Sequence, residues 1–322
     1  MTSLIKRWGR PVALPFLHWW QWFYDYSRGK LREYLEANQT VPDEAVILQD
    51  IHGIRFVLYP FDKLNRQNLV RRTADVKELQ IIPSLVQSGD TAIDIGANAG
   101  LYAVLLSRLC GQTGHVWAFE PVPDTYWRLR ETLVLNRCEN VVPVQSAICE
   151  APGCVKMNLF EQQFAEWNSL AGMSMHAADG TQIFPRQSVD VVANSLDSFC
   201  EEEHIDHINF LKVDVEGFEL AVFRGAQRLL RDHRIDYICF EISREPLKNA
   251  GVESRMVFEA LELHGYRTYR FDQNLAKFQG PIEDTSALWE NFFATWKNIG
   301  PLDGRSGNNC SIQETCSAES TK

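Results

Sequence analysis

One stretch, residues 91–107 (TAIDIGANAGLYAVLLS), constrains the fold of this chain more than any other. It opens with a short apolar run that carries Asp94 near its end, which is typical of a buried parallel strand. The turn that follows holds Gly96 and Gly100, and apolar residues then recur at helical spacing from Leu101. Strand, glycine-rich turn and helix form a layout in which the main chain approaches a ligand at a helix N-terminus.

Downstream of this stretch, predicted strands and helices alternate regularly. This alternation predicts a doubly wound, Rossmann-like, mostly parallel seven-stranded α/β sheet that binds ligands at the carboxyl ends of its strands. The predicted strands are 91–95, 116–119, 141–144, 208–213, 237–242, 266–271 and 291–296. The predicted helices are 74–86, one that starts at Pro123, 218–230 and 255–264.

The rest of the chain divides into extensions around one large domain. We expect an aromatic helical extension over 1–45, an α/β domain over 46–300 that opens with a β-hairpin, and a disordered tail over 301–322. Residues 150–200 break the regular alternation, and we interpret them as an insertion that contacts the substrate.

Composition and charge exclude several classes of protein. The net charge of −10 and the isoelectric point near 5.4 argue against a nucleic-acid binder, which would carry a basic face. The eight cysteines are scattered and form no Cys-x-x-Cys pair, so we expect reduced thiols, a cytoplasmic location and no zinc site. No apolar run approaches the roughly 20 residues of a membrane span.

Six aromatic residues crowd between Trp19 and Tyr26. The favoured interpretation is a helix packed on the large domain. The alternative is peripheral membrane contact, in which the aromatic rings lie at headgroup depth beside basic residues.

Polar residues occupy the carboxyl end of each of the first five predicted strands, and most of them are acidic. Carboxylates in such places are costly to bury unless they find partners or a cationic ligand. The residues are, strand by strand, Asp94 with Gly96, Glu120, Ser146, Asp214 with Glu216, and Glu241.

Three stretches, 92–107, 116–136 and 210–226, resemble the FkbM family of S-adenosylmethionine-dependent methyltransferases. The last is the most specific, since it reads Lys-x-Asp-x-Glu-Gly-x-Glu before a Gly-Ala pair. The resemblance covers about residues 70–300 and implies a class I methyltransferase fold. It also implies methyl transfer from S-adenosylmethionine to a hydroxyl oxygen of a small-molecule or glycan-like acceptor. The absence of an Asn/Asp-Pro-Pro-Tyr segment after 208–213 agrees with an oxygen acceptor.

The first two of these stretches predict the cofactor site. Glu120 lies 24 positions after Gly96, close to the roughly 20-residue offset at which a carboxylate reaches ribose hydroxyls. This offset serves both nicotinamide cofactors and S-adenosylmethionine. A dinucleotide, however, needs a third glycine where this chain has Leu101 or Tyr102. The predicted cofactor-binding residues are Asp94, Gly96, Ala97, Asn98, Gly100, Glu120, Pro121, Ser146 and Ala147.

Asp94 and Asn98 are assigned to the methionine part of the cofactor, although both residues could serve only to shape the turn. Ser146 and Ala147 are placed near the adenine from their position alone.

The stretch 210–226 predicts the residues that act on the acceptor hydroxyl. Lys212 and Asp214 share one face of their strand, so we expect the lysine to form an ion pair with an acid. Asp214 and Glu216 are the predicted catalytic residues, because an alcohol becomes a good nucleophile only when a base takes its proton. Glu216 could instead stabilise a helix N-terminus. In a second scheme, Asp214 and Glu241 hold Mg²⁺, which polarises the hydroxyl.

Two rival functions remain open at this stage. One is a protein that binds S-adenosylmethionine without catalysis and acts through its aromatic N-terminus. The other, less favoured, is a nicotinamide-dependent oxidoreductase. In the insertion, Trp167 is a candidate platform for a sugar, although a packing role is favoured for it.

Overall fold

The computed structural model describes residues 46–49, 53–58, 78–160, 170, 174–176, 181–272, 277–282 and 289–298. The predicted N-terminal helix, the predicted disordered tail and Trp167 lie outside these ranges. Within them, no helix is both long and apolar enough to cross a membrane.

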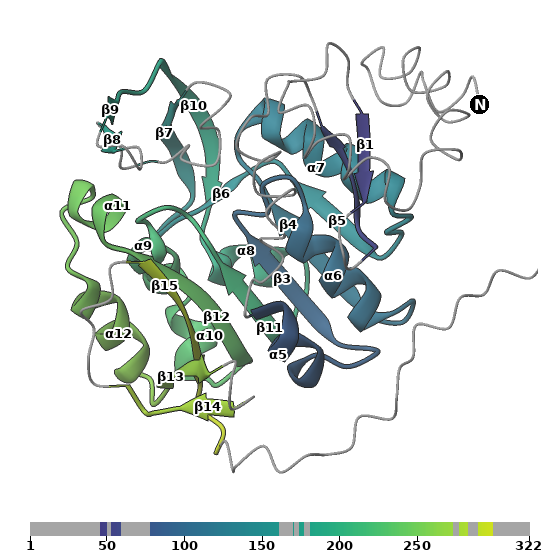
Figure 1. Ribbon diagram of the computed structural model, residues 1–322. Coiled ribbons are helices and arrows are strands. Elements are labelled where there is room, and N and C mark those ends of the chain that lie inside the picture. The colour runs from purple at the N-terminus through teal and green to yellow at the C-terminus, as the bar shows by residue number, and fades with distance from the viewer. Residues whose placement is uncertain are drawn as a thin grey trace, which may run out of the picture.

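The centre of the molecule is an eight-stranded sheet (Figure 1). Its five strands from β12 to β5 are parallel, and β15 runs antiparallel between β12 and β13. This is the doubly wound sheet that the sequence predicts. Successive strands are added outward from β3 to β5 on one side and from β11 to β12 on the other, so the strand order reverses between β3 and β11, where ligands bind in such folds. In spatial order the strands are β14 (Lys277–Gln279), β13 (Arg267–Asp272), β15 (Trp289–Thr295), β12 (Ile235–Ser243), β11 (Ile208–Val213), β3 (Thr91–Ile95), β4 (His115–Phe119) and β5 (Val141–Val144).

The prediction of seven strands was wrong by one. The extra strand is β14, which pairs only with β13 at the edge of the sheet. Its three residues, Lys-Phe-Gln, are too few to show the apolar alternation by which a strand is recognised in sequence.

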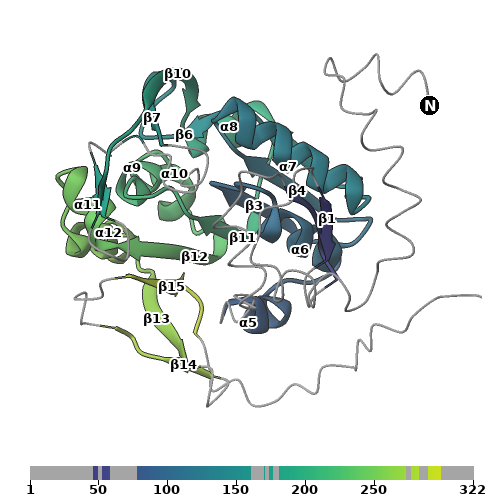
Figure 2. The same ribbon diagram turned by 45° about the horizontal axis from the view of Figure 1, so that its top comes forward.

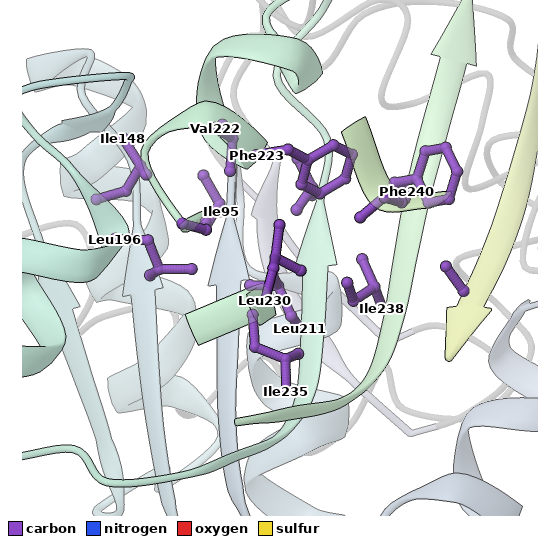
Figure 3. Packing of buried hydrophobic residues seen from close by; sticks show 14 of the residues in the cluster. Ile95, Ile148, Leu196, Leu211, Val222, Phe223, Leu230, Ile235, Ile238 and Phe240 are labelled. Carbon is purple, nitrogen blue, oxygen red and sulfur yellow. The ribbon is translucent and has the colours of Figure 1, made fainter. Parts of the chain in front are cut away.

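Alternate residues of each strand enter two separate cores, one on each face of the sheet. Ile93 and Ile95 of β3 pack on one face against α8 (Leu196–Glu202), α9 (Glu219–Arg224), α10 (Gln227–Arg231) and α12 (Ser254–Glu262), as Figure 3 shows in part. Ala92 packs on the other face against α5 (Glu78–Leu85), α6 (Leu101–Cys110) and α7 (Pro123–Leu135). Asp94 follows Ala92 by two positions, so its side chain belongs to this second face.

The helix predicted over 218–230 is in fact two helices, α9 and α10. A Cβ on Gly225 would lie 2.0 Å from the Cys149 carbonyl oxygen, so this turn packs against main chain. The Asp197 carboxylate then accepts hydrogen bonds from the main-chain N–H groups of Arg228 and Leu229 at 2.8 and 3.0 Å. A distant side chain thus caps α10, which no local pattern could indicate.

The insertion forms a small sheet of its own beyond the carboxyl ends of the main strands (Figures 1 and 2). This sheet contains β10 (Gln187–Asn194) and β7 (Gly153–Leu159) of the insertion, with β6 (Ala147–Ile148) from just before the insertion pairing with β10. A short hairpin of β8 (Met175–His176) and β9 (Gln182–Ile183) lies beside it. The Asn249 side chain at the end of α11 (Arg244–Asn249) donates to the Ser174 carbonyl oxygen at 2.8 Å. The insertion therefore contacts the helix that follows β12.

The predicted N-terminal hairpin is confirmed as β1 (Val46–Gln49) and β2 (Arg55–Leu58), which pair antiparallel. Asn136, at the end of α7, fixes its position. The amide of Asn136 accepts from the main-chain N–H of Arg55 at 3.0 Å and donates to the Arg55 carbonyl oxygen at 2.7 Å.

Candidate active site

Two loops, one after β3 and one after β11, meet at the point in the sheet where the strand order reverses. Gly96 has φ +84°, and a Cβ there would lie 1.8 Å from the main-chain oxygen of Asp214. Gly100 has φ +97°, and its Cβ would lie 2.9 Å from Leu129 of α7. Both glycines are needed, because a Cβ at either position would collide with protein atoms. Their contact with the cofactor stays a prediction.

Glu120 holds the first of these loops to the end of β4. Its two carboxylate oxygens accept main-chain hydrogen bonds from Asn98 at 3.1 Å and from Val122 at 2.9 Å. Burial raises the pKa of Glu120 to about 7, and these hydrogen bonds offset part of the effect. Each carboxylate oxygen has a second lone pair, so the group can still accept hydrogen bonds from hydroxyls.

Asp94 is a buried acid of the site with one carboxylate oxygen left unpaired within the described part of the chain. Asp94 is 1% exposed, and its Oδ2 atom has no hydrogen-bond partner among the described residues. Burial raises the pKa of Asp94 to about 7, while the charge of Lys212 lowers it in part. Leaving such an oxygen unpaired costs about 1–3 kcal/mol. The position suits a cationic group of a ligand.

Lys212 forms the predicted ion pair. Its side chain is 0% exposed, and its Nζ donates to Asp214 Oδ2 and to Asn291 Oδ1, both at 3.2 Å. The Nζ also lies 5.1 Å from the ring centroid of Tyr102. Burial alone would lower the pKa of Lys212, but the charge of Asp214 and its other anionic neighbours raises it well above its ordinary value. The lysine is therefore a structural cation.

Strand register places the polar residues on one face of the sheet. Lys212 of β11 is paired with Asp94 of β3 and with Cys239 of β12. Two positions further along β12, Glu241 is paired with Asn291 of β15. Since paired residues and residues two apart share a face, these side chains form one row across the sheet, on the face covered by α5 and α6.

Asp214, Glu216 and Glu241 come together at the end of this row. Each offers a carboxylate oxygen, and these oxygens all lie within 4.8 Å of one another. Glu216 has φ 50°, a left-handed conformation that costs a non-glycine residue about 1–3 kcal/mol and that clusters at functional sites. Burial, together with the charge of Asp214, raises the pKa of Glu241 well above its ordinary value. Three oxygen ligands of this kind could also hold a divalent cation.

Further residues of interest lie beside this row. Glu219 is buried and accepts from the main-chain N–H of Gly217 at 3.2 Å. Ser146 and Ala147 follow β5, but Ser146 donates to the Val192 carbonyl oxygen at 3.2 Å and Ala147 is paired with Ala193. Both residues thus join the main sheet to the insertion, and their role at the adenine stays a prediction, as does that of Pro121.

Sequence reasoning missed Tyr102, Asn291 and Trp289. Trp289 is paired with Ser243, and its indole N–H donates to Glu241 Oε1 at 2.7 Å. The predicted last strand begins at Asn291, two residues too late to include Trp289. An antiparallel last strand starts at the edge where the parallel strands end, so its first residues were the available signal.

Comparison with known proteins identifies relatives with named activities. The chain is 27% identical over 236 residues to the hexuronic acid methyltransferase AglP of Haloferax volcanii, a match that covers 72% of this chain and 86% of that protein. It is 24% identical over 201 residues to the 2-O-methyltransferase NoeI of Sinorhizobium fredii, covering 61% of this chain and 81% of NoeI.

Among solved structures, the methyltransferase FkbM of Methylobacillus flagellatus is similar at 13% identity and a TM-score of 0.39, over 85% of this chain and 60% of that one. The model of the methyltransferase FkbM domain matches residues 94–268, which is more than half of the chain and contains every acid of the row. The chain belongs to the FkbM methyltransferase family.

Proposed function

We propose that this methyltransferase moves a methyl group from S-adenosylmethionine to a hydroxyl oxygen of a small-molecule or glycan-like acceptor. The observation that carries the proposal is a buried oxygen of Asp94 that has no hydrogen-bond partner among the residues the structure describes. It lies next to Glu120 on one side and to the three clustered acids on the other. Membership of the family supports the donor. The names of two relatives, a hexuronic acid methyltransferase and a 2-O-methyltransferase, support a sugar-like hydroxyl.

The residues around Asp94 fit the donor. When bound, S-adenosylmethionine supplies an activated methyl group on a sulfonium centre. Asp94 Oδ2 lies near the end of β3 and is buried without a hydrogen-bond partner among the described residues, and an ammonium group would satisfy it. The free lone pairs of Glu120 would accept hydrogen bonds from ribose hydroxyls.

The clustered acids are assigned to the acceptor. The hydroxyl oxygen forms a bond to the methyl carbon as the carbon–sulfur bond breaks, and its proton passes to Asp214 or Glu216. Glu241 is not assigned as the base, because its Oε1 already accepts a hydrogen bond from the Trp289 indole N–H at 2.7 Å. Most of the rate enhancement would come from holding the hydroxyl in line with the methyl group.

A divalent cation at Asp214, Glu216 and Glu241 is the second scheme. The spacing of the three oxygens favours it. Against it, the Lys212 ammonium already lies 3.2 Å from Asp214 and supplies a positive charge to the cluster. We therefore assign the proton transfer to the carboxylates alone.

Calorimetry with S-adenosylhomocysteine tests the donor assignment. Wild-type protein should bind it, and Asp94→Asn should weaken binding about tenfold or more, because a charge-assisted hydrogen bond contributes about 1.5–3 kcal/mol. Asp190→Asn is the matched control, since Asp190 is an exposed acid paired with Lys156. It should bind as the wild type does.

The pH dependence of the same titration sharpens the test. The pKa of Asp94 is raised to about 7, so below pH 7 the free protein must release a proton before the carboxylate can bind an ammonium. Affinity should therefore rise with pH, by up to about tenfold per unit between pH 5 and 7, and the rise should be shallower in Asp94→Asn. Binding of NADH in place of S-adenosylhomocysteine would overturn the assignment.

A further inference from the structure

Trp289 is an exposed aromatic residue fixed beside the acids. Trp289 is 69% exposed, more than Phe184 at 62%, the other aromatic residue among the large exposed hydrophobic residues that the structure describes. Its indole N–H donates to Glu241 Oε1 at 2.7 Å. Ring exposure normally costs hydrophobic free energy, so a large indole left in solvent yet held in place by a hydrogen bond is an arrangement suited to binding.

The register of the sheet fixes where this ring stands. Trp289 is paired with Ser243, and Asn291 is paired with Glu241. All four side chains share the face that carries Lys212, because paired residues and residues two apart point the same way. β15 runs in the opposite direction to its neighbour β12 (Figure 3), so its first residues lie at the edge where β12 ends. Trp289 therefore continues the polar row at the carboxyl edge.

The chemistry of this neighbourhood combines a flat apolar surface with hydrogen-bond acceptors. The edge of the indole is held by Glu241, and the oxygens of Asp214 and Glu216 lie within 4.8 Å of the Glu241 oxygen. A pyranose ring offers the complementary pair of features, a face of C–H groups and a rim of hydroxyls. An acyclic alcohol offers the hydroxyl alone.

We propose that Trp289 is the platform on which a pyranose acceptor stacks, with one ring hydroxyl directed to the clustered acids. This inference rests on the proposed function and narrows its acceptor to carbohydrate. Glu241 then acts as a positioning residue, because its hydrogen bond fixes the plane of the indole. The residue that determines acceptor choice lies at the start of the last strand rather than in the insertion.

The test uses a panel of methyl pyranosides, namely the glucoside, galactoside, mannoside, N-acetylglucosaminide and glucuronoside, with glycerol as the acyclic comparison. Methyl transfer is followed with labelled S-adenosylmethionine. At least one pyranoside should be methylated with a KM well below that of glycerol. Trp289→Ala should raise that KM tenfold or more with little change in kcat, and Trp289→Phe, which keeps a flat ring, should recover part of the loss.

Controls separate this proposal from the proposed function. Leu263→Ala removes a similarly exposed apolar residue, at 79% exposure, from the end of α12 and should behave as the wild type. S-adenosylhomocysteine should bind Trp289→Ala as it binds the wild type. If the wild type itself does not bind it, the proposed function has failed.

Three results would overturn the platform while leaving the donor assignment intact. They are transfer to none of the pyranosides, transfer to glycerol with equal efficiency, and an unchanged KM in Trp289→Ala. Loss of S-adenosylhomocysteine binding in Trp289→Ala alone would also overturn it, because the ring would then serve the cofactor or the fold.

Discussion

On the β3–β4 side of the site, Asp94 and Glu120 are buried acids, and no ion pair joins either of them to a basic side chain among the described residues. On the β11–β12 side, Asp214 forms an ion pair with the Lys212 ammonium at 3.2 Å, and the Asp214 side chain is 30% exposed. The acids on the β3–β4 side therefore have no ion-pair partner in the described part of the chain and could accept a cationic group of a ligand, whereas Asp214 on the β11–β12 side is already paired with the Lys212 ammonium. The difference indicates which half is left to bind a cationic donor.

The largest expected effect concerns turnover on the β11–β12 side. Asp214→Asn and Glu216→Gln should leave S-adenosylhomocysteine affinity nearly intact, and the substitution that removes the base should lower kcat about 10²–10⁴-fold. Single-turnover kinetics with an accepted pyranoside measure this. If both variants keep full activity, neither acid is the base, and the β11–β12 side has no role in proton transfer.

The same assay decides between the carboxylate and metal schemes. EDTA should leave turnover unchanged, because the proposed base needs no cation. If EDTA abolishes turnover and Mg²⁺ restores it, the three acids hold a metal and the assignment of a free base is wrong.

The second effect concerns the stability that the internal cation provides. Lys212→Met should lower the free energy of unfolding by about 3–5 kcal/mol, because it leaves Asp214 and its neighbours without their buried partner. Urea denaturation measures the change. Lys156→Met, which removes an exposed lysine from a surface ion pair, is the control and should leave the midpoint unchanged. An unchanged midpoint in Lys212→Met would show that the row does not depend on its cation.

The smallest effect concerns the contact between the two halves. Gly96→Ala should cost about 1–3 kcal/mol more than Gly251→Ala, because its Cβ would collide with the Asp214 carbonyl group. Gly251 also has a left-handed backbone, at φ +70°, but a Cβ added there would meet nothing within 4 Å. The control therefore carries only the backbone strain, about 1 kcal/mol. Equal losses in the two variants would mean that the loops can separate at little cost.

Much of the fold could be predicted from sequence because its signals are local. The apolar run before Gly96 and the helical spacing after Gly100 define β3 and α6 without reference to the rest of the chain. The three stretches that resemble the FkbM family likewise lie inside the matched region or overlap it. In contrast, the break between α9 and α10 depends on Asp197 and Cys149, which are distant in sequence.

The sequence by itself determined the order of strands and helices, the acids at the strand ends and the pairing of Lys212 with an acid, since each follows from periodicity over a few residues. Only the tertiary structure decided that Gly96 makes room for Asp214, that Asp94 Oδ2 lacks a hydrogen-bond partner in the described part of the chain, and that Trp289 stands beside Glu241. These three facts depend on strand register and on the contact of two loops. Strand register and the loop contact bring together residues that are far apart in the chain, and a local sequence pattern contains no information on which distant residues meet.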